Sequence, residues 1–281
     1  MSAVLRFIAA VLCFGLGHPQ IRAQEAGTRL TTLVPMDLHF TQTAPYSDAE
    51  SIAKHFGYKV PLPDYAITNE LFALKVPGIS PTNESWGLLV WISRADQPTV
   101  PADWESELAK QHLLFVSAYH SGNGRHPLDR FRLALDATCN MCRRYTVDRQ
   151  RIYIGGFSGG ARMASMLGVA YADVFTGTLC LCGVNFYADI PTAGSQYYPA
   201  TFTPNPGVLL LGKRAGRFVL LTGEHDENRD NTAQIFDKGF KREGFRNVRY
   251  VEVPGLRHEM PSAKTLATAL EYLGDNHGDR H

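Results

Sequence analysis

Short apolar runs alternate with helix-length segments over most of the chain, and this alternation constrains the fold more than any other feature of the sequence. The runs typical of strands span residues 71–76, 87–93, 113–118, 151–154, 178–182, 217–222 and 248–253. The segments typical of helices span residues 102–111, 129–144, 158 onward, 231–243 and 262–273. Because neighbouring parallel strands need a crossover, the alternation predicts one α/β domain over residues 65–281, with a doubly wound, mostly parallel sheet and helices on both faces.

The first 23 residues have the organisation of a secretory signal peptide. Arg6 precedes an apolar run over residues 7–16, Ala23 provides a small residue before a polar segment, and the stretch contains no acidic residue. The run is too short to span a bilayer, so we expect no stable membrane anchor. A frayed N-terminal helix is the alternative interpretation. The pattern predicts an exported protein, periplasmic or secreted, in which residues 24–64 form an irregular N-terminal arm.

The charge balance excludes some classes of partner. The chain has 28 basic and 27 acidic side chains, and 44% of its residues are hydrophobic. The hydrophobic fraction is too high for a disordered chain, and the balanced charge lacks the basic field on which nucleic-acid binding depends. Neither nucleic acid nor an anionic membrane surface is an expected partner.

Four cysteines follow the predicted signal peptide: Cys139, Cys142, Cys180 and Cys182. In an exported chain an even number of cysteines favours disulfide bonds, with the connectivity left open. Buried thiols and a zinc site are the alternatives. The positions within a predicted helix and a predicted strand are unlike the turns that usually carry structural zinc, so no metal site is expected.

A Gly-x-Ser-x-Gly pentapeptide occupies residues 156–160, directly after a predicted strand and directly before a predicted helix. This context indicates a nucleophile elbow, a tight turn that exposes Ser158. Such a turn excludes bulky side chains at neighbouring positions, and Gly156 and Gly160 meet this requirement. The N–H of Gly159 would then point from the helix N-terminus at a developing oxyanion. A phosphate-binding loop is the alternative, but the sequence lacks the lysine that such a loop carries.

A serine hydroxyl needs a base to accept its proton, and an elbow predicts that an acid and then a histidine follow later in the chain. Asp226 comes just after the predicted strand 217–222 and is the candidate acid, with Glu224 and Asp230 as alternatives. His258 lies between the last predicted strand and the last predicted helix, and is the candidate base.

Two further segments border the predicted site. The loop after strand 87–93 should supply the second oxyanion donor, for which we nominate the backbone N–H of Arg94, with that of Ser93 next. Residues 185–214 interrupt the alternation and are rich in proline and aromatic residues. We expect them to form an ordered loop that acts as a lid or as a wall of the binding site.

In these residues the chain resembles α/β-hydrolases, and more narrowly exported bacterial esterases of the polyhydroxybutyrate depolymerase and feruloyl esterase group. The resemblance covers about residues 69–273 and is carried by segments 151–164, 220–226 and 254–258. One departure is that Ile92 and Ser93 stand where that group commonly has a His-Gly pair.

The resemblance implies a carboxylic-ester hydrolase in which Ser158, His258 and Asp226 act as a triad through an acyl-enzyme. It implies a small-molecule or polymeric ester as substrate, and neither a metal nor an organic cofactor. A serine peptidase of the same fold and a non-catalytic exported binding protein are the alternatives.

Overall fold

The computed structural model describes residues 33–57, 64–77, 85–192 and 196–275. The predicted signal peptide, residues 1–23, lies outside the described residues. Within the described ranges, eight strands form the main sheet: β1 (Leu33–His39), β2 (Leu71–Pro77), β3 (Trp86–Ile92), β4 (Leu113–Ala118), β5 (Val147–Phe157), β6 (Gly177–Leu181), β9 (Arg217–Gly223) and β10 (Asn247–Val253). The α-helices are α1 (Ala49–Phe56), α2 (Trp104–Lys110), α3 (Pro127–Arg144), α4 (Gly159–Ala170), α5 (Pro206–Arg214), α6 (Arg229–Gln234) and α7 (Ala263–Gly274).

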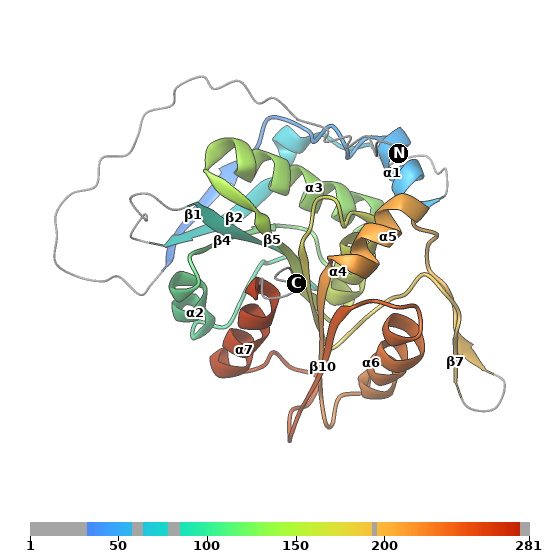
Figure 1. Cartoon of the computed structure of the whole chain (residues 1–281). Helices are drawn as coiled ribbons and strands as arrows, with labels where there is room; N and C mark the ends of the chain where they lie inside the picture. Colours follow the sequence, from blue (N-terminus) through green and yellow to red (C-terminus); the bar gives the residue numbers. More distant parts are fainter. Residues whose placement is uncertain (1–32, 58–63, 78–84, 193–195, 276–281) are drawn as a thin grey trace, which may run out of the picture.

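The strands lie in the order β1-β2-β4-β3-β5-β6-β9-β10 (Figure 1). Every neighbouring pair from β4 to β10 is parallel, whereas β2 runs antiparallel to both of its neighbours, β1 and β4. The predicted doubly wound, mostly parallel sheet is therefore confirmed. All the strands predicted from the sequence are present, and β5 is longer than predicted at both ends.

Helices cover both faces of the sheet because the central strands are apolar on both sides. Along β3, Leu88, Val90 and Ile92 pack into the core that includes α3 and α4, while Leu89 and Trp91 pack into the core that includes α2 and α7. Figure 1 shows these two pairs of helices on opposite sides of the sheet. The alternation of side chains along a strand explains why one continuous apolar run serves two cores.

The prediction of an irregular arm over residues 24–64 is wrong for the part of it that the structure describes. Strand β1 pairs along its whole length with β2 and forms an edge of the sheet, and α1 follows. The segment is tied to α3 by the buried carboxylate of Asp136, which accepts hydrogen bonds from the Ala44 N–H, the Ser47 hydroxyl and the Tyr65 hydroxyl. These partners are distant in sequence, so local patterns do not reveal the pairing.

The prediction of disulfide bonds is also wrong, because Cys139, Cys142, Cys180 and Cys182 are all thiols. The first two are three residues apart on α3, where Cβ atoms lie about 5–6 Å apart, farther than the Cβ atoms of a disulfide. Cys182 has a φ of 55°, and this turn places its side chain in the opposite core from Cys180.

Residues 185–214 contain more regular structure than the predicted ordered loop. They hold the two-stranded pair β7 (Ile190–Pro191) and β8 (Tyr197–Tyr198), followed by α5. The predicted helix 231–243 begins as α6 and continues as a π-helix over Ile235–Lys241, against which β7 packs. None of the helices in the described ranges has the length and apolar character needed to cross a membrane.

Candidate active site

The turn from β5 into α4 has the geometry expected of an elbow. Strand β5 ends at Phe157, α4 begins at Gly159, and Ser158 between them has φ 55° and ψ −119°. A positive φ is unfavourable for a residue with a Cβ atom, so the surrounding packing must hold Ser158 in place. The side chain of Ser158 is consequently presented at the carboxyl end of the parallel strands, where polar groups from other strand ends meet it.

Two glycines allow the backbone of this turn to pack without a side chain in the way. A Cβ atom on Gly156 would lie 2.4 Å from the carbonyl carbon of Gly160, and a Cβ atom on Gly160 would lie 1.9 Å from the carbonyl oxygen of Ile92. The first turn of α4 therefore lies directly against the end of β3. This contact brings the loop after β3 beside Ser158.

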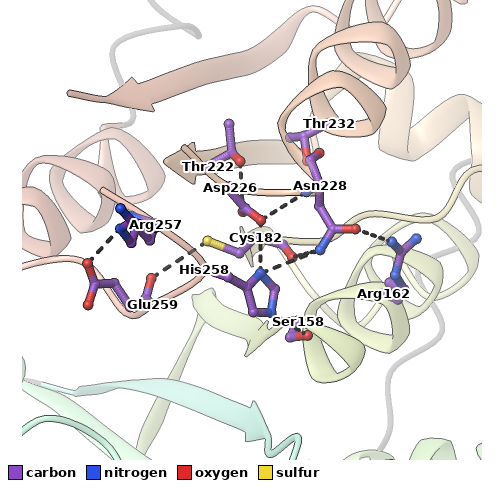
Figure 2. A network of polar contacts seen from close by, with 10 residues as sticks. All are labelled: Ser158, Arg162, Cys182, Thr222, Asp226, Asn228, Thr232, Arg257, His258 and Glu259. Atoms are coloured by element: carbon purple, nitrogen blue, oxygen red, sulfur yellow. Dashed lines mark hydrogen bonds and ion pairs between the residues drawn. The ribbon is translucent and has the colours of Figure 1, made fainter. Parts of the chain in front are cut away.

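Ser158, His258 and Asp226 form one chain of hydrogen bonds, shown in Figure 2. The Oγ atom of Ser158 lies 2.9 Å from Nε2 of His258, and Nδ1 of His258 lies 2.9 Å from Oδ1 of Asp226. A carboxylate only accepts, so the Nδ1 atom carries a proton and Nε2 is left as an acceptor for the serine hydroxyl. The structure brings together the three side chains nominated from the sequence, although His258 is 100 residues from Ser158.

The carboxylate of Asp226 is buried and surrounded by donors. Its Oδ2 accepts from the Thr222 hydroxyl and its Oδ1 from the Asn228 N–H, each at 2.9 Å. Burial alone would raise the pKa of Asp226, but hydrogen bonds from the Cys182 thiol, Asn228, His258 and Thr222 outweigh it and hold the pKa below its usual range. Asp226 is therefore ionised at neutral pH, as a partner for the His258 ring must be.

The two alternative acids lie elsewhere. Glu224 is exposed and its Oε2 accepts from the Gly255 N–H at 2.8 Å, while Asp230 is exposed and lies 3.4 Å from the Arg229 guanidinium. Neither carboxylate contacts His258 in the described structure. The choice between the three acids, which spacing alone left open, is made by the tertiary structure.

Asn228 connects this chain of hydrogen bonds to α4. Its Nδ2 donates to the Cys182 carbonyl at 3.2 Å and lies 3.5 Å from Nδ1 of His258, and its Oδ1 accepts from Arg162 at 2.8 Å. Figure 2 shows the Arg162 guanidinium pointing at this amide from one turn beyond Ser158. Sequence reasoning missed both residues, although Asn228 follows the acid by two positions.

The two nominated oxyanion donors lie on either side of the contact between α4 and β3. Gly159 is the first residue of α4, so its N–H has no acceptor within the helix. In the described part of the chain the backbone N–H of Arg94 also donates to no other group. The guanidinium of Arg94 lies 5.1 Å from the centre of the Phe157 ring, beside the elbow.

Two residues that were not nominated from the sequence donate hydrogen bonds to the backbone of Ser93 and Arg94. Asn123 donates its backbone N–H to the Arg94 carbonyl at 3.0 Å, and its side chain lies against Gly159. Arg130, which is only 4% exposed, donates to the Ser93 carbonyl at 2.9 Å. Asn123 could have been nominated from the sequence, because it follows the carboxyl end of β4, where site residues gather. Nothing in the sequence indicates that Arg130 on α3 is buried and contacts the site.

Cys182, Asp226 and His258 are the one group in the described ranges whose ligand atoms could share a metal ion, all lying within 4.8 Å of one another. A metal needs a thiolate, and burial raises the pKa of the Cys182 thiol. Asp226 and Nδ1 of His258 are already hydrogen-bonded to each other. The donor set therefore fits the hydrogen-bonded chain better than a metal centre.

Comparisons with known proteins give matches in structure only. No model of a protein family matches the chain, and neither does any curated protein sequence. A mutant of the feruloyl esterase module of Clostridium thermocellum, complexed with sinapinate, is similar over 89% of this chain and 92% of its own, with 13% identity and a TM-score of 0.59. The S-formylglutathione hydrolase (FrmB) of Staphylococcus aureus is similar over 88% and 97%, with 12% identity and a TM-score of 0.57.

A third similar structure comes from a larger protein assigned as a dipeptidyl aminopeptidase IV, from Bacteroides ovatus. The similarity extends over 86% of this chain but over only 36% of that larger protein, with 12% identity and a TM-score of 0.54. At such identities the likeness concerns the fold. The present chain has the α/β-hydrolase fold.

The contact between α4 and β3 predicts the effect of a single methyl group. Gly160→Ala should lower the free energy of unfolding by about 1–3 kcal/mol, because the added Cβ atom would collide with the Ile92 carbonyl. Gly124→Ala is the matched control, since a Cβ atom there has no neighbour within 4 Å. Urea unfolding measures both variants, and equal stability of the two would contradict the proposed contact.

Proposed function

We propose that this protein is a serine hydrolase that cleaves carboxylic esters. The single observation that carries the proposal is the pair of 2.9 Å contacts that joins Ser158 Oγ through the His258 ring to Asp226. The strained backbone at Ser158 supports it, because a merely structural serine would not require that strain. Asp226 supports it because a buried carboxylate that is kept ionised lies against the His258 ring.

The geometry supports a two-step reaction through an acyl-enzyme. Ser158 Oγ attacks the ester carbonyl carbon while His258 Nε2 takes the hydroxyl proton, and the same imidazolium then gives that proton to the departing alkoxide. Water attacks the acyl-enzyme with His258 again as base, releasing the carboxylic acid and restoring Ser158. Asp226 orients the ring through Nδ1 and stabilises its charged form.

We assign the oxyanion hole to the backbone N–H groups of Gly159 and Arg94. The Arg94 N–H belongs to the same peptide group as the Ser93 carbonyl, which Arg130 holds. In a trans peptide the N–H and C=O point in opposite directions, so a donor on the carbonyl side aims the N–H away from Arg130. Arg130 is thus proposed as a positioning residue for the second donor.

Arg130 is an unusual group to use for this purpose. Burial lowers its pKa to about 10, and no carboxylate lies within 4.0 Å of it in the described structure. A buried cation on the carbonyl side also polarises the peptide and strengthens its N–H as a donor. This arrangement offers one solution for a chain that lacks the His-Gly pair after β3.

The names of the similar structures guide the choice of ester. The feruloyl esterase module binds sinapinate, and the staphylococcal protein is named a hydrolase of S-formylglutathione. Esters of aromatic acids and thioesters are therefore the first substrates to test, as small molecules and as polymer-linked esters. The aminopeptidase likeness keeps a peptidase of the same fold as the second candidate.

We also propose that the protein is exported. The pattern of residues 1–23 supports this proposal. The disulfide bonds that export would favour give it no support, because the four cysteines of the described part are thiols.

Replacing the nucleophile tests the proposal directly. Ser158→Ala should abolish labelling by a fluorophosphonate and lower ester turnover by at least about a thousandfold, because the acyl-enzyme can no longer form. His258→Ala should weaken labelling, and Ser106→Ala is the matched control. Folded wild-type protein that takes no label would favour the non-catalytic alternative, and cleavage of aminoacyl anilides without cleavage of p-nitrophenyl esters would favour the peptidase.

Replacing each acid in turn tests the role of Asp226. Asp226→Asn should lower kcat by roughly a thousandfold or more, because an amide at that position stabilises the wrong tautomer of His258. Glu224→Gln and Asp230→Asn remove the same charge from exposed positions and should keep kcat within about threefold of the wild type. Equal losses in all three variants would mean that overall charge, rather than the hydrogen bond to His258, explains the effect.

Replacing Arg130 tests the orientation of the second oxyanion donor. Arg130→Met should lower kcat roughly tenfold to a hundredfold with little change in KM, because the oxyanion forms only after the substrate is bound. Affinity for a boronic acid analogue should fall in parallel with kcat/KM, and Arg130→Lys should recover part of both. Thermal melting identifies any misfolded variant. A folded Arg130→Met with unchanged kcat and boronate affinity would contradict the assignment.

A further inference from the structure

A cavity of about 210 Å³ lies beside the candidate active site. Its walls come from α4, from the segment that follows β6, and from α6 with the π-helix after it. Val184, Phe186, Ile190 and Ile235 make most of the wall apolar. Arg162, which follows Ser158 by one turn of α4, contributes a charged side chain to the wall. Tyr198 also lines the cavity and interacts electrostatically with Arg162.

The Arg162 guanidinium is half-buried and has neutral partners only. It donates to the Val184 carbonyl at 3.2 Å, to Asn185 Oδ1 at 3.3 Å and to Asn228 Oδ1 at 2.8 Å. No carboxylate lies within 4.0 Å of it in the part of the chain that the structure describes. Those three bonds use three of the five N–H groups of the side chain, so two remain for a ligand.

The charge of Arg162 is only partly balanced from within the protein. Burial lowers the pKa of this guanidinium, and the nearby charge of Asp226 acts in the opposite direction without contact. Asp226 is itself committed to the His258 ring. A partly desolvated cation at the wall of an open cavity is stabilised most by an anion that can accept two of its hydrogen bonds, and a carboxylate has this geometry.

We propose that this cavity is a subsite for a carboxylate group carried by the ester substrate, with Arg162 as the residue that recognises the charge. The inference rests on the proposed ester hydrolysis at Ser158 and names the class of ester. Ser158 and Arg162 are four residues apart, which is about 6 Å along the helix axis. The carboxylate should therefore be separated from the scissile carbonyl by only a few atoms, as in a half-ester of a short dicarboxylic acid.

The proposal is tested with pairs of esters that differ in charge and little in shape. Monomethyl adipate carries the carboxylate on the acyl side, and methyl adipamate replaces it with an amide. O-acetylglycolate and O-acetylglycolamide make the same comparison on the alcohol side. Wild-type protein should prefer the charged member of at least one pair about tenfold or more in kcat/KM, and the pair that shows the preference identifies the side of the ester that enters the cavity.

Variants of Arg162 separate recognition of charge from any effect on Asn228. Arg162→Gln should bring the charged-to-neutral ratio close to one, whatever happens to both rates, and Arg162→Lys should retain part of the preference. Arg143→Gln is the matched control, since it removes an exposed arginine at the end of α3 and should leave the ratio unchanged. Two results would overturn the subsite: no charge preference in the wild type, or equal losses for both members of each pair in Arg162→Gln.

A binding measurement keeps this test independent of turnover. In Ser158→Ala protein, calorimetric titration with adipate should detect binding that Arg162→Gln weakens about tenfold, with adipamide as the neutral comparison. Adipate binding, together with wild-type protein that shows neither esterase activity nor fluorophosphonate labelling, would contradict the proposed function and retain the carboxylate subsite. Esterase activity of the wild type without adipate binding by the Ser158→Ala variant would retain the function and overturn the subsite.

Discussion

The close contact between the first turn of α4 and the end of β3 is the constraint on which the site depends. Because Gly160 has no side chain, the helix can begin against the Ile92 carbonyl, and Ser158 is held at an otherwise unfavourable positive φ. The same contact places the loop after β3 beside the nucleophile, where the Arg94 N–H is without another acceptor. One glycine therefore links the position of the proposed nucleophile to that of a proposed oxyanion donor.

Three charged side chains, Asp226, Arg130 and Arg162, are withdrawn from solvent near the carboxyl ends of the parallel strands, and their burial determines the electrostatics of the site. Asp226 is buried, and neutral donors rather than a cation hold its pKa low, so its charge remains directed at His258. Arg130 and Arg162 have the complementary property, since each is a desolvated cation without a carboxylate in contact in the described part of the chain. The charge of Arg130 is thus available to the peptide group between Ser93 and Arg94, and the charge of Arg162 is available to the cavity.

Much of the fold was predictable from local patterns, but contacts between distant segments were not. The strand and helix periods predicted the parallel sheet, and the Gly-x-Ser-x-Gly context predicted the elbow at Ser158. The edge strand β1 was missed because its pairing with β2 and the Asp136 contacts join segments far apart in sequence. The disulfide prediction failed because it depended on cysteine number, whereas the φ of Cys182 turns its thiol away from that of Cys180.

The candidate site divides in the same way. The sequence by itself singled out Ser158 and His258 and predicted that an acid lies between them in the chain, since an elbow requires an acid and a histidine at later strand ends. Only the tertiary structure decided between Asp226 and its two competitors, and only it brought Arg130 to Ser93 and Arg162 to the cavity. The physical reason is that residue spacing constrains what lies on one strand end or helix turn, whereas burial, hydrogen-bond direction and the balance of charge depend on neighbours supplied by the rest of the fold.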